Sequence, residues 1–303
     1  MVQGEIIWIK PGDVSNYHLG SILNGGGSHP NRNKNADIKE WLNLADEVYL
    51  ESIDRSRGGA GIPIIWGTDA VHGHNNVIGA TLFPHNIGLG AANDPSLLRS
   101  IGEITAREVA VTGIDWIFAP TVATVKDNRW GRTYEGYSSE SDIVGKYSRE
   151  IVIGIQGDNL SELRSNPEKL ISTAKHFVGD GGTYRGIDQG NTILSLEDLL
   201  EQHGQGFYTA IDAGVQTIMA SFNSWNGDKI HGNKYLLTDI LKNQMGFDGF
   251  VISDWQGIDE IPGDYKSDII TSINAGIDMV LSLIHISEPT RQEAISYAVF
   301  CLK

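Results

Sequence analysis

The sequence Ile62-Pro-Ile-Ile-Trp-Gly-Thr-Asp69 is a short apolar run that ends in a carboxylate, and Trp116–Pro120 is a second apolar run further along the chain. A helix is predicted between these two runs. Asp94 is a favoured N-cap residue, Pro95 suits the first helical position, and Gly113 provides the stop. The order of strand, helix and strand indicates a parallel sheet with helical crossovers.

The same alternation recurs along the rest of the chain. A second predicted helix runs from Ser195, with Asp198 three positions on as a capping box, to near Gly214, and a third runs over Lys266–Ala275. This repetition favours an α/β fold of the (β/α)8 barrel type, although an open sheet also fits. The predicted strands are Gly20–Asn24, Ile62–Asp69, Trp116–Pro120, Ser172–Phe177, Val215–Phe222, Gly249–Asp254 and Asp278–Val280.

The composition narrows the function classes. The chain has 303 residues, with 23 Lys and Arg against 38 Asp and Glu and a formal net charge of −15. This acidic balance argues against electrostatic binding to nucleic acid or to anionic lipid. No apolar run approaches the roughly 18 residues of a membrane-spanning helix. The single cysteine, Cys301, excludes a disulfide framework, and no phosphate-binding or dinucleotide-binding glycine motif is present.

The two ends of the chain differ from its middle. Leu281–Lys303 resembles a translated sequencing-library adapter, because residues 281–291 and 295–303 match adapter codons and three variable codons lie between them. We therefore predict that 281–303 is a foreign tail that does not pack. The alternative is an ordinary C-terminal helix. Met1–Glu5 lacks the features of a signal peptide and is typical of the inside of a domain, so 1–280 is predicted to be an incomplete barrel domain.

Polar side chains stand where three predicted strands end: Asp69 on one, Lys175 and His176 on the next, and Asp254 on the last. The carboxyl ends of barrel strands converge on one mouth, where active sites form. A helix N-cap explains a single aspartate of this kind but not the whole set. We therefore predict one pocket of about monosaccharide size, flanked by Trp255.

Two reaction classes fit these side chains. Glycoside hydrolysis needs a carboxylate nucleophile and a carboxylic acid that protonates the leaving oxygen, and Asp254 fits the nucleophile. Metal-assisted hydrolysis is the alternative, because Asp69, His72 and His74 form the pattern D-x-x-H-x-H. A non-catalytic carbohydrate-binding fragment is a third hypothesis.

Five runs of sequence resemble the N-terminal barrel of glycoside hydrolase family 3, in its branch of β-glucosidases and β-glucan exohydrolases. They occur in the family's order across almost all of residues 1–280. The runs are Trp66-Gly-Thr-Asp-Ala-Val-His-Gly-His-Asn-Asn76, Ala80-Thr-Leu-Phe-Pro-His-Asn-Ile-Gly-Leu-Gly90, Arg129-Trp-Gly-Arg-Thr-Tyr-Glu135, Lys175-His-Phe-Val-Gly-Asp-Gly-Gly-Thr183 and Gly249-Phe-Val-Ile-Ser-Asp-Trp255.

The resemblance implies a role for individual residues. Asp254 matches the nucleophile of a retaining, exo-acting β-glucosidase that releases glucose from the nonreducing end of β-glucans or cello-oligosaccharides without a cofactor or a metal. The residues matched to the site of the glucosyl unit are Asp69, Arg132, Lys175, His176, Met219 and Trp255. Glu135 and Asp180 lie inside the motifs, and we expect them to orient Arg132 or Lys175 by pairing with them.

The resemblance also implies what lies outside these motifs. In this branch the acid/base glutamate comes from a second α/β sandwich domain, so that domain is an expected partner and the chain alone is expected to be inactive on natural glucans. Phe222 replaces a tyrosine of related plant enzymes, so either another group sets the pKa of Asp254 or that pKa is lowered less than in those enzymes. The implied ligand is a β-linked gluco-oligosaccharide or β-glucan, and the parent protein is expected to be periplasmic or secreted. A β-xylosidase of the same family is the alternative.

Overall fold

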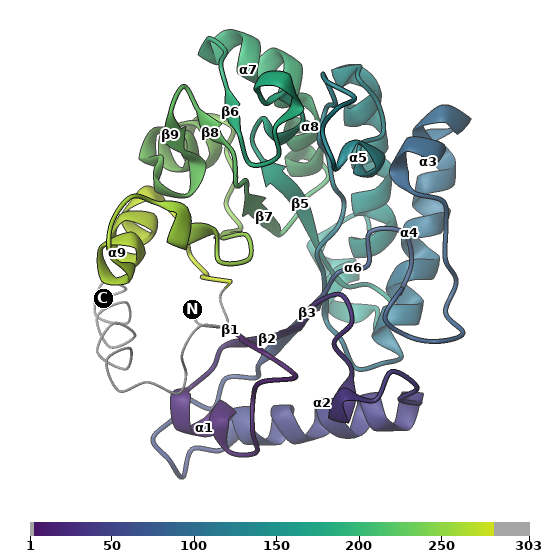
Figure 1. Ribbon diagram of the computed structural model, residues 1–303. Helices are drawn as coiled ribbons and strands as arrows, with labels where there is room; N and C mark the ends of the chain where they lie inside the picture. The colour runs from purple at the N-terminus through teal and green to yellow at the C-terminus, as the bar shows by residue number, and fades with distance from the viewer. Residues whose placement is uncertain (1–2, 282–303) are drawn as a thin grey trace.

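A computed structural model describes residues 3–281, which form an α/β fold around a curled, seven-stranded parallel sheet (Figure 1). Hydrogen-bonded neighbours follow the order β1-β2-β3-β4-β5-β7-β10, so each strand lies beside the next sheet strand along the chain. This is the order of a (β/α)8 barrel, and the sheet forms a half-barrel. The strands are β1 Gln3–Glu5, β2 Ser21–Asn24, β3 Ile65–Thr68, β4 Trp116–Ile117, β5 Ile171–Phe177, β7 Thr217–Ala220 and β10 Phe250–Ile252.

Helices surround the convex face of the sheet (Figure 1). Their apolar faces and the outer side chains of the strands form the two largest core clusters. The helices are α1 Asp13–Tyr17, α2 Ile38–Ile53, α3 Asn86–Ala92, α4 Pro95–Ala110, α5 Ser141–Gln156, α6 Leu160–Ser165, α7 Leu196–His203, α8 Gln205–Asp212, the π-helix η6 Tyr235–Gln244 and α9 Tyr265–Ala275.

The caps predicted from the sequence form. The Asp94 carboxylate accepts the Ser96 N–H at 3.1 Å, and α4 begins at Pro95. The helix ends at Ala110, slightly before the predicted stop, and Gly113 at φ 81° then turns the chain toward β4.

Some elements differ from the prediction. The helix predicted from Ser195 is correctly capped but is interrupted at Gly204, which separates α7 from α8. In the segment predicted as the last strand, Met279 forms an isolated parallel bridge to Ile252 of β10, and no strand is assigned there within the described residues. Strand β1 was not predicted, because its Gln3 and Glu5 are polar although both are buried. The small sheet of β6 Asn191–Thr192, β8 Ser224–Trp225 and β9 Asp228–Lys229 was not predicted either.

A third cluster fills the concave side of the sheet, and its buried members are Leu23, Trp116, Phe118, Met219, Ile252, Met279 and Leu281. Leu281, the first residue of the predicted foreign tail, is buried, and its N–H donates to the Ser253 hydroxyl at 2.7 Å. Residues 282–303 lie outside the described residues, so the prediction for the rest of the tail stays a prediction. Within 3–281, every helix is too short or too polar to cross a bilayer.

Candidate active site

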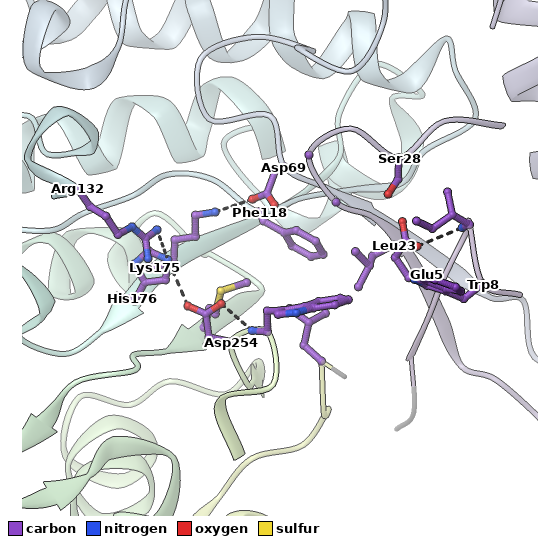
Figure 2. Close-up of a pocket in the computed structure, with 16 residues that line it drawn as sticks. Glu5, Trp8, Leu23, Ser28, Asp69, Phe118, Arg132, Lys175, His176 and Asp254 are labelled. Carbon is purple, nitrogen blue, oxygen red and sulfur yellow. Dashed lines mark hydrogen bonds and ion pairs between the residues drawn. The ribbon is translucent and has the colours of Figure 1, made fainter. Parts of the chain in front are cut away.

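A cavity of about 460 Å³ opens where the carboxyl ends of the barrel strands meet (Figure 2). This volume lies within the range of about 300–1,000 Å³ that is usual for small-molecule sites. All seven residues predicted as nucleophile or sugar-binding groups line it. They are Asp69, Arg132, Lys175, His176, Met219, Asp254 and Trp255.

Lys175 and His176 both line the cavity although they are adjacent in β5. In a regular strand, neighbouring side chains point to opposite faces of the sheet. Here the pairing of β5 with β7 shifts register between Lys175 and Phe177, and this irregularity brings both polar side chains to the same side. The sequence contains no local signal for this shift.

Lys175 forms an ion pair with Asp69, with 2.7 Å between Nζ and Oδ1. The Lys175 side chain is only 6% exposed, whereas the Asp69 side chain is 44% exposed. The pair therefore compensates the buried ammonium and leaves the carboxylate facing the cavity, where it can accept hydrogen bonds from hydroxyl groups.

Arg132 is held by Glu135 through two parallel hydrogen bonds, of 2.7 and 2.8 Å. Burial of Glu135 opposes its ionisation, but the hydrogen bonds and charge of Arg132 outweigh burial and lower the pKa of Glu135. This bidentate geometry fixes the plane of the guanidinium group. The expected pairing of Glu135 with Arg132 is therefore present.

The tautomer of His176 follows from its two neighbours. Its Nε2 lies 3.0 Å from Nη2 of Arg132, which can only donate, so Nε2 must accept. Nδ1 then carries the proton and donates to Asp180 Oδ2 at 2.9 Å. Burial, together with the charges of Arg132 and Lys175, lowers the pKa of His176 well below its usual value, so the ring stays neutral.

The expectation that Asp180 pairs with Lys175 or Arg132 is wrong. The chain turns through the short helix η3, Asp180–Gly182, directly after β5, and this turn returns the carboxylate to the ring of His176. The Gly181 N–H donates to the other carboxylate oxygen at 2.9 Å. Burial raises the pKa of Asp180 to about 7.

Asp254 follows β10 and is buried, with one carboxylate oxygen held and the other free. Oδ1 accepts the Trp255 N–H at 2.7 Å. Among the described residues, Oδ2 has no hydrogen-bond partner, and it lies 3.6 Å from His176 Nε2. Burial raises the pKa of Asp254 to about 6, although the charges of Arg132 and Lys175 oppose the rise. Burial and the charges of Arg132 and Lys175 thus set the pKa of Asp254, and Phe222 has no hydroxyl group that could contribute.

The cavity also has an end that the sequence did not predict. Glu5, Trp8 and Ser28 line it, and Leu23 and Phe118 lie between this end and Asp254 (Figure 2). Leu23 and Phe118 lie in predicted strands, so the strand pattern could have placed them in the sheet beside the cavity. Glu5 lies on the unpredicted strand β1, and burial raises its pKa.

The histidines of the metal hypothesis do not join Asp69. His72 Nδ1 lies 2.9 Å from the Phe83 carbonyl oxygen, and His74 is buried with Nε2 3.1 Å from the Thr112 hydroxyl. Neither ring lines the cavity. Within residues 3–281, no group of three His, Cys, Asp or Glu side chains is arranged to hold a metal ion. The described residues therefore give the D-x-x-H-x-H hypothesis no support.

Comparison with known proteins finds a family model and a solved structure that match nearly the whole chain. The family model described as the glycosyl hydrolase family 3 N-terminal domain matches residues 2–299. A mutant exo-1,3/1,4-β-glucanase (ExoP) from a Pseudoalteromonas species superposes with a TM-score of 0.94 at 50% identity, covering 100% of this chain and 48% of that one.

Two curated relatives are more distant. The lysosomal β-glucosidase of Dictyostelium discoideum is 31% identical over 90% of this chain and 34% of its own length. The periplasmic β-glucosidase of Salmonella typhimurium is 27% identical over 73% of this chain and 28% of its own length. The chain thus spans about a third of the length of the curated relatives it matches.

Proposed function

The chain belongs to glycosyl hydrolase family 3, and we propose that it supplies the glucosyl site and the nucleophile of a retaining, exo-acting β-glucosidase. One observation carries the proposal: Asp254 lines a cavity with charged walls, one of its carboxylate oxygens is held by the Trp255 N–H, and the other has no hydrogen-bond partner among residues 3–281. A nucleophilic carboxylate needs this combination of fixed orientation and a free lone pair.

In the first step, Oδ2 of Asp254 attacks the anomeric carbon of the terminal sugar. A bond forms between this oxygen and the carbon, the bond to the leaving oxygen breaks, and the leaving oxygen takes a proton from a carboxylic acid. We assign that acid to the glutamate of the second domain that the family resemblance implies. In the second step, the same group takes a proton from a water molecule whose oxygen attacks the anomeric carbon. The bond between this carbon and Oδ2 of Asp254 breaks, which regenerates the carboxylate and releases the sugar with retained configuration.

The cavity walls supply the contacts of the sugar. Asp69 is an exposed acceptor, and Arg132, kept planar by Glu135, is a donor. Charge-assisted hydrogen bonds of this kind orient a sugar ring for attack. Trp255 offers an aromatic face for stacking, and Met219 from β7 lines the apolar base.

The proposal extends to the surroundings of the parent protein. The substrate is a β-linked glucoside or gluco-oligosaccharide that presents its nonreducing end to the cavity. We place the parent outside the cytoplasm, and the relative named a periplasmic β-glucosidase supports this assignment.

The test uses 2,4-dinitrophenyl 2-deoxy-2-fluoro-β-glucoside, whose leaving group departs with little protonation. The chain, shown to be folded by circular dichroism, should be labelled once per molecule, and peptide mapping should place the label on Asp254. Asp254→Ala should remove the label, whereas Asp46→Ala, at an exposed position on α2, should not. A label on another carboxylate of the folded chain would contradict the assignment.

A second arm addresses the sugar. The matching 2-fluoro-xyloside, which lacks the hydroxymethyl group, should label more slowly than the glucoside. Faster labelling by the xyloside would favour the β-xylosidase alternative.

A further inference from the structure

We infer that His231 is the positioning residue of the nucleophile: its ring nitrogen Nε2 accepts the main-chain N–H of Asp254 at 2.9 Å and fixes the direction of that residue's carboxylate. The inference rests on the proposed function, because it assigns His231 a role in the attack by Asp254. His231 itself does not line the cavity and touches no reacting atom.

The Asp254 N–H lies just beyond β10, and successive N–H groups of an extended chain point to opposite sides. The Ser253 N–H donates to the Met279 carbonyl at 2.9 Å on one side, and the Phe250 N–H donates to a carbonyl just before β7 on the other. The Asp254 N–H points to this second side, beyond the end of the paired strand, and it donates to His231. A buried N–H without an acceptor destabilises the fold, so the ring that supplies the acceptor holds the turn in place.

His231 is fixed between the loops that follow two barrel strands. It belongs to the short helix η5, Ile230–Gly232, and is fully buried. A Cβ on Gly257 would stand 2.4 Å from two atoms of its ring, so only a glycine lets the turn after Asp254 approach this closely. On another side, the ring lies 5.9 Å from the ring of Phe222, measured between centroids.

The protonation state of His231 suits an acceptor. The Asp254 amide can only donate, so Nε2 must present a lone pair and Nδ1 must carry the proton. Burial, with the charge of Lys229 adding to it, lowers the pKa of His231 to about 3. The acceptor therefore persists over the whole pH range in which Asp254 can be ionised.

Two hydrogen bonds therefore fix the main chain before and after the side chain of Asp254. His231 takes the N–H of Asp254, and the N–H of Trp255 holds Oδ1 of the same residue. With these two bonds in place, Oδ2 has one direction available. Loss of the His231 acceptor should therefore slow the attack while leaving the affinity for the sugar unchanged, because the charged groups that contact the sugar, Asp69 and Arg132, lie in the loops after β3 and β4.

The first experiment measures the labelling of Asp254 by the 2-fluoro-glucoside in variants of the whole chain. His231→Leu, which removes the acceptor, should lower the first-order rate constant of labelling by roughly 10- to 100-fold with an unchanged half-saturating concentration. His231→Gln, which can place a carbonyl oxygen near the position of Nε2, should recover the rate to within about fivefold of the wild type. The matched control is His74→Leu, because His74 is equally buried but lies against Trp41 and Thr112.

The control variant should label at the wild-type rate per folded molecule, with the folded fraction taken from circular dichroism. His231→Leu labelling at the wild-type rate would overturn the inference. Gln and Leu variants that are equally slow would overturn it as well, since the role would then lie in packing and not in the acceptor.

The second experiment needs neither a variant nor turnover. In chain labelled with ¹⁵N, the bond predicts a scalar coupling across the hydrogen bond between the Asp254 amide nitrogen and His231 Nε2, with His231 in the Nδ1–H tautomer. Absence of this coupling in the folded chain overturns the inference even if the leucine variant does not fold. If the coupling is present but the wild type is not labelled at Asp254, the contact stands and the proposed function fails.

Discussion

The mouth of the barrel and the contact between α4 and α5 are stabilised in opposite ways. At the mouth, charged groups are packed together: Lys175 with Asp69 and Arg132 with Glu135. Between the two helices, apolar side chains meet and two glycines approach, so that a Cβ on Gly102 would stand 3.0 Å from the Cα of Gly154.

The difference shows where this fold gives up stability for a site. Burying a charge costs free energy that a partner only partly returns, whereas close packing of apolar helices adds to stability. In the mouth, burial raises the pKa of Asp254, the proposed nucleophile, to about 6, which means that the fold disfavours its ionised form. Changes at the mouth should therefore affect labelling first, and changes at the helix contact should affect unfolding alone.

The largest expected effect separates function from stability at one residue. Asp254→Asn should lower the rate of labelling by roughly 10³-fold or more. It should also stabilise the chain at pH 7, because the pKa of Asp254 is raised from 3.8 to about 6 and its ionised form costs the folded state roughly 1–3 kcal/mol there.

The stabilisation has a defined pH window. Below the unfolded pKa of 3.8, Asp254 is protonated in both states, so the gain should vanish near pH 3; it should grow between the two pKa values and level off above the folded pKa of about 6. Urea unfolding of the wild type and of Asp254→Asn at pH 3.5 and pH 7 measures this gain in stability. An asparagine variant less stable than the wild type at pH 7 would contradict the raised pKa.

The second effect is the pH dependence of labelling in the wild type. Only the ionised carboxylate attacks, so the rate should be flat above about pH 6 and fall tenfold for each unit below it, to roughly a hundredth at pH 4. The measurement is the labelling rate from pH 4 to 8 on the folded chain. An acid limb centred near pH 4 would mean that Asp254 is less desolvated than the structure implies.

The third effect concerns the partner of Arg132. Glu135→Gln removes the charge that holds the guanidinium group, so the half-saturating concentration of the probe should rise by roughly 10-fold. The maximal labelling rate should change less, because Arg132 contacts the sugar and not the attacking oxygen. A change confined to the maximal rate would place Arg132 closer to the reaction than we propose.

The fourth effect belongs to the helix contact. Gly154→Ala puts a methyl group against the Arg99 carbonyl on α4, so the free energy of unfolding should fall by roughly 1–3 kcal/mol. Labelling of the molecules that remain folded should be unchanged. A loss of labelling without a loss of stability would show that the two regions are coupled.

The smallest effect is expected at an exposed ion pair on the outside of the barrel. Arg107 and Glu168 are 3.1 Å apart, with side chains 58% and 54% exposed. Glu168→Gln should change the free energy of unfolding by less than about 1 kcal/mol, because water and salt screen this pair. A loss clearly above about 1 kcal/mol would show that solvent does not screen this exposed pair.

Much of the fold could be predicted because its signals are local. The cap at Asp94, the proline after it and the apolar runs before Asp69 and Asp254 each act within a few residues, and each appears in the structure. Strand β1 was missed for the same reason, since its buried Gln3 and Glu5 carry no apolar pattern.

The site could be predicted as a set of residues but not as a set of contacts. Carboxyl ends of parallel strands must converge, so the sequence alone determined that Asp69, Lys175, His176 and Asp254 would face one cavity. Only the tertiary structure decided their partners. Asp180 turned to His176, and the Asp254 amide found the ring of His231 from 23 residues away. The physical reason is that the donor–acceptor distance of a hydrogen bond varies by only a few tenths of an ångström. The packing of the loops sets that distance, and no local sequence pattern encodes it.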